Sequence, residues 1–565
     1  MDEYTEQCKS MKFEVDPLET EESNNKRINM LNKHCLQTIF RKLSPVEKVR
    51  IELVCKIWQE ESQNAWSRIK DIELDSLKLG FLPVGKLHEI KPITYHVARE
   101  VLKRCGKYIH RIDFKEKQKF CAMDVISEFC PNIQCIENAY ATSKGLRCMA
   151  NDRTCRNLVK LHIRALVPER TEWDVLFGTI FDNNKNLQFL KIGNGNALNG
   201  DCLDHLPLDK LKELSIQIPY SNAARFIERL VWVSMAATNL TSLCICVKNG
   251  NEDIINSLSN VHFKKMTELE LTCLLYIDNL DEKLSRIFMG NKSLIRLKLY
   301  LAGMDVISGE CFLNLSSSIQ IFQADTYRCT IDEYLCTSLQ KFENLTILDI
   351  DITREDYVYI LIDSLTNCLY LRKLSLNLVV YTTCALAEAI RGLDQLEHLK
   401  ITSIQNNDAM DEHLFQCISS ITGLKSLSIS GFQDLSENGF GHLLTEIDLT
   451  ELYISDIPFF SGDNLGKAKR LENLTVIDCP DFSEDAIVEF LKVGFNLKFL
   501  TLRGIEWSNR ERIIIGAVSL VNSVKYTQEF LVIDMDLENI DIRLLQPGCK
   551  KLQLVDTDPQ SWTSP

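Results

Sequence analysis

A short row of apolar residues, spaced apolar-x-x-apolar-x-apolar, recurs along most of this 565-residue chain and constrains its fold more than any other feature. The rows follow one another at steps of 22 to 29 residues, about 26 on average. They begin at Ile109, Ile133, Leu158, Leu187, Leu211, Leu240, Met266, Leu294, Ile319, Leu345, Leu371, Leu396, Leu424, Leu449, Leu471 and Leu497. Each row suits a short β-strand. Segments between rows, such as 411–418 and 483–491, open with acidic residues and continue with apolar residues at helical spacing.

The period predicts an α/β fold over residues 105–555, in which a strand and a return helix form each repeat. One such repeat cannot offset the conformational entropy of its own chain, so the repeats have to stack. Parallel stacking of the strands produces a curved solenoid with a parallel sheet on its concave face. Residues 556–565 follow the last weak row and are expected to form a tail.

Composition and charge exclude several other classes of protein. With 45% apolar and 25% charged residues, the chain is neither collagen-like nor globally disordered. Its net charge of −14 argues against nucleic acid as a partner. The N-terminus has no apolar signal region and no stretch is long enough to span a membrane, so we expect neither secretion nor a membrane partner. The 21 cysteines form no Cys-x-x-Cys pair, and we expect reduced thiols in a cytoplasmic or nuclear protein without a metal site.

The N-terminal part of the chain has a different pattern. Residues 1–27 are polar and acidic, which predicts disorder. Residues 28–74 contain three short helical patterns, and the second begins at Ser44-Pro45 with serine as the N-cap and proline in the first turn. Three short helices form only a small core, which is marginal without a partner or a neighbouring domain.

This N-terminal block resembles an F-box. The resemblance rests on Leu31, on the segments LQTIFRKLS at 36–44 and LVCKIW at 53–58, and on Trp66. A helical linker at 75–104 and cysteine-bearing rows such as the one ending in Cys479-Pro480 are similar to those of F-box/leucine-rich-repeat proteins with cysteine-containing repeats. The resemblance covers residues 28–555. Leu31 is followed by Asn32 where the family usually has proline, and asparagine can cap a helix instead.

The resemblance implies a substrate-recognition subunit of a cullin–RING (SCF-type) E3 ubiquitin ligase, which is not itself an enzyme. Its F-box would bind a Skp-family adaptor, and through it a cullin and a RING subunit, while its repeats would bind a protein substrate. The implied adaptor-binding residues are Leu31, Asn32, Cys35, Leu36, Ile39, Phe40, Leu43, Leu53, Val54 and Trp58. The alternative is a leucine-rich-repeat scaffold or inhibitor that binds a protein without any ligase.

The strand residues between the leucines are candidates for substrate binding, because side chains alternate along a strand and these residues face the concave side. The candidates are Arg111, Lys160, His162, Arg164, Lys191, Arg296, Lys298, Tyr300, Phe499 and Arg503. The basic residues among them would suit an acidic or phosphorylated segment, and the alternative is an ordinary solvated face. The sequence has no His-Glu-x-x-His or Gly-x-Ser-x-Gly motif, so we predict no catalytic residue and no cofactor.

Overall fold

The structure is a computed structural model, and it divides the chain into two compact units, Met1–Lys70 and Asp71–Pro565. It describes residues 31–75, 79, 93–114, 120–151, 155–165, 172–193, 198–218, 223–247, 252–259, 263–273, 278–301, 308–325, 333–352, 355–378, 383–403, 409–410, 412–505, 507, 510–526, 528, 531–535 and 552–555. The predicted disordered N-terminus, most of the predicted linker and the predicted tail lie outside these residues.

The described residues of the N-terminal unit, 31–70, form three helices, α3 (Lys33–Lys42), α4 (Pro45–Ile51) and α5 (Lys56–Trp66). Asn32 caps α3, because its side-chain oxygen accepts a hydrogen bond of 2.8 Å from the backbone N–H of Cys35. Ser44 and Glu47 form a reciprocal capping box at the start of α4, with Pro45 in the first turn. These caps confirm the predicted helix starts, and asparagine replaces proline at the first one without loss of the helix.

The core of this unit is small. Leu36, Phe40 and Ala65 are buried together, and the Phe40 and Trp58 rings meet edge to face with centroids 5.2 Å apart. Trp66 is fully buried, and its indole N–H donates to Glu52 at 2.7 Å. The structure thus places Leu36 and Phe40 inside the unit, where they form a buried cluster with Ala65.

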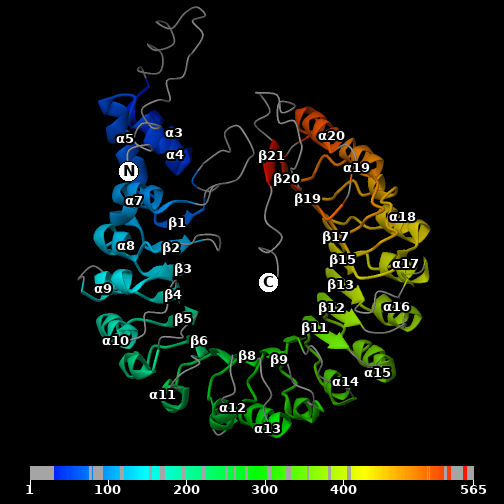
Figure 1. The fold of residues 1–565 in the computed structure, drawn as a ribbon, viewed down its shortest axis with the longest axis horizontal. Coiled ribbons are helices and arrows are strands. Elements are labelled where there is room, and N and C mark those ends of the chain that lie inside the picture. The colour runs from blue at the N-terminus through cyan, green and yellow to red at the C-terminus, as the bar shows by residue number, and fades with distance from the viewer. Residues whose placement is uncertain are drawn as a thin grey trace, which may run out of the picture. The chain divides into compact units, whose positions relative to one another are not determined.

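The second unit is built on one parallel sheet, in which the described residues form 19 strands (Figure 1). The strands are β1 (Asp71–Leu74), β2 (Arg111–Phe114), β3 (Cys135–Ala141), β4 (Lys160–Ala165), β5 (Phe189–Gly193), β6 (Glu213–Ile218), β7 (Ser242–Val247), β8 (Glu268–Cys273), β9 (Arg296–Leu301), β10 (Ile321–Asp325), β11 (Ile347–Ile352), β12 (Lys373–Leu378), β13 (His398–Ser403), β15 (Ser426–Ser430), β17 (Glu451–Ser455), β18 (Asn473–Ile477), β19 (Phe499–Arg503), β20 (Leu531–Met535) and β21 (Leu552–Val555). A separate two-stranded sheet pairs β14 (Ala409–Met410) with β16 (Asp434–Leu435).

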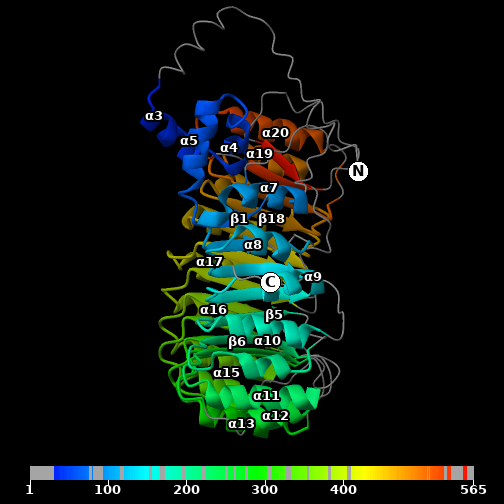
Figure 2. The ribbon, with the colours of Figure 1, turned by 90° about the vertical axis from the view of Figure 1, so that its left-hand side faces the viewer.

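Helices cover the opposite, convex face of the sheet, and Figure 2 shows α8, α10 and α11 stacked in chain order. The helices are α7 (Tyr95–Cys105), α8 (Met123–Phe129), α9 (Ser143–Asn151), α10 (Trp173–Asn183), α11 (Ala223–Ala236), α12 (Glu252–Ser259), α13 (Leu280–Gly290), α14 (Glu333–Leu339), α15 (Glu355–Leu365), α16 (Thr383–Arg391), α17 (Glu412–Ser419), α18 (Glu437–Glu446), α19 (Glu484–Leu491) and α20 (Glu511–Asn522). Shorter 3-10 helices are η1 (Gly106–Tyr108), η2 (Asp201–His205), η3 (Glu310–Asn314) and η4 (Leu465–Lys467).

The leucine rows stack in register across this sheet. Leu161, Leu190 and Leu214 are directly paired on β4, β5 and β6, and all three are buried between sheet and helices. The predicted solenoid with its parallel concave sheet is therefore confirmed. The sheet begins earlier than residue 105, since Asp71–Leu74 pairs with β2 and belongs to the repeat unit rather than to the three-helix unit.

Among the described residues, three repeats depart from the predicted strand-plus-helix plan, because η2, η3 or η4 replaces an α-helix. An acidic residue in the first turn of the neighbouring helix holds the loop before each of them. The Asp174 carboxylate accepts backbone hydrogen bonds from Asn199 (2.6 Å), Gly200 (3.0 Å) and Cys202 (3.2 Å). Gly200 has a φ of 97°, which favours glycine. The same arrangement recurs with Asp281 and Gly309 before η3, and with Glu437 and Gly462 before η4.

Aromatic rings join successive repeats inside the core. Phe415, Phe440, Phe460 and Phe482 lie one repeat apart, and neighbouring ring centroids are 5.5 to 5.8 Å apart. Such contacts add to the area that each repeat buries against the next. The repeats therefore depend on their neighbours, as expected for a solenoid.

Candidate functional site

Charged side chains gather on the concave face of the first half of the sheet. They lie between the buried leucines of strands that pair in register, so they point away from the core and toward one another across the strands. We call them the charged face: Arg111 of β2, Glu137 of β3, Lys160 and His162 of β4, Lys191 of β5, Glu213 of β6, Glu268 and Glu270 of β8, and Arg296 and Lys298 of β9.

The first basic residues of the charged face share one carboxylate. Arg111 Nε lies 2.6 Å from Glu137 Oε1, and Lys160 Nζ lies 2.7 Å from Glu137 Oε2. Burial acts to raise the pKa of Glu137, but the hydrogen bonds from Lys160 and Arg111 outweigh it and hold the pKa below its ordinary value. Arg111 and Lys160 therefore share one carboxylate, and an acidic partner would have to compete with Glu137 for either of them.

His162 is not a cation at neutral pH. Burial and the neighbouring Lys160 lower its pKa to about 4. Its Nε2 lies 4.0 Å from Glu213 Oε1 and, among the described residues, has no hydrogen-bond partner. The expectation of a basic residue at His162 is wrong, because the folded chain desolvates the ring and places a lysine beside it.

A polar cavity of about 270 Å³ opens on the charged face between β5 and β9. Three of the predicted substrate-binding residues, Lys191, Arg296 and Lys298, line it. We call it the mixed-charge pocket, because three carboxylates also line it, and its floor is made of small side chains. The carboxylates are Glu213, Glu268 and Glu270, and the floor residues are Ser215, Ser242 and Cys244.

Burial shapes the chemistry of this pocket. It raises the pKa of Glu213, an effect that Lys160 and Lys191 only partly offset. It also raises the pKa of Cys244 to about 12, so the floor thiol stays protonated and unreactive at neutral pH. Charged side chains rather than a reactive thiol therefore set the chemistry of the pocket.

The remaining predicted substrate-binding residues do not join this pocket. Arg164 and Tyr300 are half-buried on β4 and β9. Phe499 is exposed on β19. Arg503 is a correction to the prediction: only 6% of it is exposed and it pairs with Asp534 of the next strand, so a partner cannot reach its guanidinium.

The sequence reasoning placed Glu268 and Glu270 on the concave face but missed two other carboxylates of the charged face, Glu137 and Glu213. Glu213 occupies the same position of its row as Lys160 and Arg296, so the row alignment already placed it on the face. Glu137 was harder to find, because a register shift between β3 and β4 lies beside it and Asn138 adopts a positive φ of 55°. Applying the same alternation to the acidic residues of the early rows would have found Glu213.

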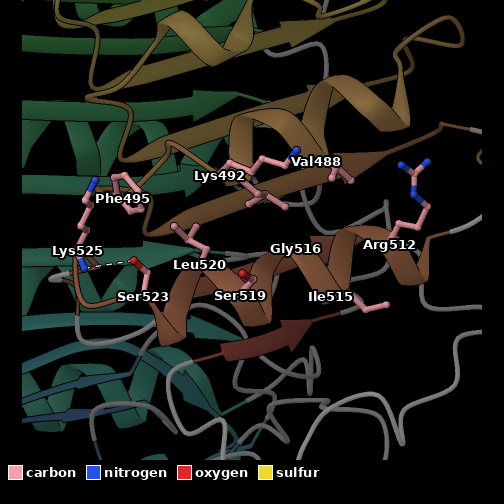
Figure 3. A pocket seen from close by; sticks show the side chains of 11 residues that line it. Val488, Lys492, Phe495, Arg512, Ile515, Gly516, Ser519, Leu520, Ser523 and Lys525 are labelled. Atoms are coloured by element: carbon pink, nitrogen blue, oxygen red, sulfur yellow. Dashed lines mark hydrogen bonds between the residues drawn. The ribbon is translucent and has the colours of Figure 1, made fainter.

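A second cavity, of about 470 Å³, lies on the helical side between α19 and α20 (Figure 3). Two of the cationic side chains that line it already have partners within the chain. Arg512 contacts Glu484 at 3.1 Å and Asp485 at 2.7 Å, while Lys525 Nζ lies 5.4 Å from the ring centroid of Phe495. These contacts favour a structural role for this cavity.

The N-terminal unit exposes several large apolar side chains. Leu31 and Ile39 of the α3 region are partly exposed, and the turn between α4 and α5 exposes 85% of Leu53 and 60% of Val54. Ile57, which lies on α5 and was not among the predicted contacts, is also exposed. We call these five residues the exposed apolar set.

The other predicted adaptor-binding residues are divided between surface and interior. Asn32 and Cys35 are exposed, while Leu43 and Trp58 are partly buried against the core. Leu36 and Phe40 are 3% and 2% exposed, so they are corrected from contact residues to core residues.

Within the described ranges, no group of three or more potential metal ligands is found, and no helix has the length and apolar character needed to cross a membrane. No known protein family and no curated protein matches the chain. The crystal structure of an internalin from Listeria monocytogenes is similar at 17% identity, covering 66% of this chain and 88% of the internalin, with a TM-score of 0.31. The crystal structure of a TLR13–ssRNA13 complex is similar at 13% identity, covering 81% of this chain and 67% of the matched chain, with a TM-score of 0.32.

Proposed function

We propose that this chain is the substrate-recognition subunit of a cullin–RING E3 ubiquitin ligase. The three-helix unit binds a Skp-family adaptor, which brings the cullin and the RING subunit, and the repeat unit binds a protein substrate. The observation that carries the proposal is the exposed apolar set on a unit whose own core is small.

The exposed apolar set has a physical reason to bind another protein. Leu53 and Val54 contribute nothing to the core of their own unit, since most of each side chain is in solvent. Burial of apolar surface yields about 25 cal/mol per Å². An adaptor that covers the turn between α4 and α5 would bury this surface, and the burial would stabilise the complex. The buried residues of the unit would hold the turn in place.

Proximity is the contribution of such a subunit to the reaction. The chain holds a substrate lysine near a charged ubiquitin-conjugating enzyme and so raises its effective concentration at the thioester. No nucleophile or base from this chain is needed. The concave charged face is the proposed place where the substrate is held.

A pull-down of the full chain with purified Skp-family adaptor tests the proposal. The Leu53→Ser, Val54→Ser double variant should retain at least about tenfold less adaptor than the wild type, because both changes remove apolar surface without touching the core. The matched control is Val175→Ser with Leu369→Ser, which changes the same residue types at exposed positions of the repeat unit and should retain the adaptor fully.

The outcome also separates this function from a scaffold or inhibitor that acts without a ligase. If the wild type does not retain the adaptor, or if the Leu53/Val54 variant retains as much as the wild type, the ligase assignment is wrong. Circular dichroism of each variant shows whether the helices are intact.

A further inference from the structure

The lining of the mixed-charge pocket has an ordered arrangement of charge across five adjacent strands. Lys191 lies on β5 and Glu213 on β6. The small Ser242 and Cys244 follow on β7, then Glu270 on β8 and Lys298 on β9. Lys191, Cys244, Glu270 and Lys298 share one cross-strand row, whereas Glu213 lies two residues earlier on β6, in the row of Ser242. Taken strand by strand, the order is cation, carboxylate, small floor, carboxylate, cation.

These four charges do not pair with one another. In the part of the chain that the structure describes, Lys191, Lys298 and Glu270 have no oppositely charged group within 4.0 Å. Glu213 has only His162 at that distance, and the imidazole is neutral because burial lowers its pKa. The pocket's other pair, Arg296 with Glu268 at 3.7 Å, is already formed. Four charges of balanced sign therefore line one cavity without ionic partners.

Strand spacing sets the distances between these groups. Adjacent strands lie about 4.8 Å apart, so the two carboxylate strands are separated by about 10 Å with β7 midway. Because Glu213 is offset by two residues along the strands, it faces Glu270 diagonally across the floor, about 12 Å away. Each lysine strand lies about 10 Å from the floor, on opposite sides. An extended peptide advances about 3.3 Å per residue, so about three residues connect the floor to either lysine.

We propose that the mixed-charge pocket binds an extended protein segment with the pattern acidic-x-x-basic-x-x-acidic. The basic side chain sits over the β7 floor between Glu213 and Glu270, and the acidic side chains pair with Lys191 and Lys298. This inference rests on one part of the proposed function, namely that the repeat unit binds a protein.

Other ligand classes fit the pocket less well. A phosphate or a nucleic-acid backbone would meet Glu213 and Glu270 at the centre, where like charges repel. An apolar side chain would desolvate the same carboxylates without pairing them, which is unfavourable. The small floor residues leave space at the centre for one long side chain, and the carboxylates on both sides select a positive one.

The test uses the full chain and two fluorescein-labelled peptides at about 20 mM salt, where ionic contacts are least screened. The first is Gly-Glu-Ser-Ser-Arg-Ser-Ser-Glu-Gly, and the second exchanges every Glu and Arg. Fluorescence anisotropy should show the first peptide binding about tenfold more tightly, since three ionic contacts each contribute a few-fold. Raising the salt should reduce this preference.

Matched variants locate the site. Glu213→Gln with Glu270→Gln should abolish the preference for the first peptide. Glu228→Gln with Glu446→Gln changes the net charge equally at exposed helix positions and should preserve it. Equal binding of the two peptides, or no binding of either, overturns the proposal. So does equally tight binding of arginine amide alone, which would assign a small cation in place of a segment.

The peptide test and the adaptor test fail independently. A chain that retains the adaptor but shows no peptide preference refutes only the recognition pattern. A chain that shows the preference but retains no adaptor keeps the recognition pattern and refutes the ligase. The Glu213/Glu270 variant should retain the adaptor as the wild type does.

Discussion

The concave sheet has two stretches that share a backbone and differ in chemistry. The charged face occupies β2 to β9, where ion pairs and unpaired charges line the surface. On β15 to β18 the equivalent positions carry mostly hydroxyl groups, and we call these residues the hydroxyl face: Ser426, Ser428, Ser430, Tyr453, Ser455 and Thr475. Ser430 and Ser455 are hydrogen-bonded at 2.7 Å between neighbouring strands.

The comparison shows which residues define the fold and which define recognition. Leu269 on β8 and Leu427 on β15 occupy equivalent positions, and both are buried. Their neighbours on the concave side are carboxylates in one stretch and serines in the other. Because the facing residues contribute little to the core, the same solenoid can carry either surface.

The largest expected effect is a loss of stability when a buried leucine is removed, and both stretches should show it. Leu269→Ala and Leu427→Ala should each lower the local free energy of opening by about 2–5 kcal/mol, because each leaves a cavity in the core. Hydrogen exchange resolved by strand measures this. Exposed Val175→Ala serves as the control, with little expected change. A loss in only one stretch would show that the leucine rows are not equivalent.

The next effect should separate the stretches by pH. His162 has a pKa of about 4 in the folded chain and about 6.5 unfolded, so the unfolded state binds the proton more readily between these values. Stability from the neutral ring is therefore fully present above about pH 6.5 and is lost as the pH falls toward 4. The loss should reach about 2 kcal/mol around β4.

Hydrogen exchange at increasing urea concentration measures this loss at pH 7 and near pH 4.5. The exchange rates are corrected for the dependence of intrinsic exchange on pH. In His162→Gln the loss should disappear, while β15 should respond equally in both proteins. If wild type and variant lose stability around β4 in parallel, His162 is not the titrating group.

A smaller effect should distinguish the stretches by salt. Glu137→Gln removes the carboxylate shared by Arg111 and Lys160 and should cost about 1 kcal/mol of local stability at low salt, and less at high salt. Glu451→Gln is the matched control, because Glu451 accepts a hydrogen bond from the Asn473 side chain that glutamine can also accept. Equal salt dependence of the two variants would contradict this difference.

The smallest effect concerns the hydroxyl face itself. Ser430→Ala removes the hydrogen bond to Ser455 and should cost about 0.5 kcal/mol, with no dependence on salt. Exchange of the β15 and β17 amides at low and high salt measures it. A clear salt dependence would mean that charge also stabilises this stretch.

Much of the fold was predictable because its signals are local. The repeated rows predicted the strands that they span, and Asn32 and Ser44 indicated the starts of α3 and α4. The substitution of η2, η3 and η4 for helices was not predictable, because each loop is held by an acid from the preceding repeat, such as Asp174 for Gly200.

The candidate site was predictable only in part. Lys191, Arg296 and Lys298 were placed on one face by strand alternation, and they do line one pocket. Arg503 followed the same alternation but is buried against Asp534, a residue 31 positions away in sequence. Pairing between distant residues leaves no local pattern, so alternation alone could not separate buried positions such as Arg503 from accessible ones.

The amino-acid sequence by itself determined the repeat period, the buried rows and the helix starts, because these depend on residues within one turn, one strand or one repeat. Only the tertiary structure decided which charges are neutralised, which side chains of the three-helix unit form its core, and where a pocket opens. Those outcomes depend on desolvation and on contacts between residues that are far apart in the sequence. Neither can be read from a single residue or from its neighbours along the chain.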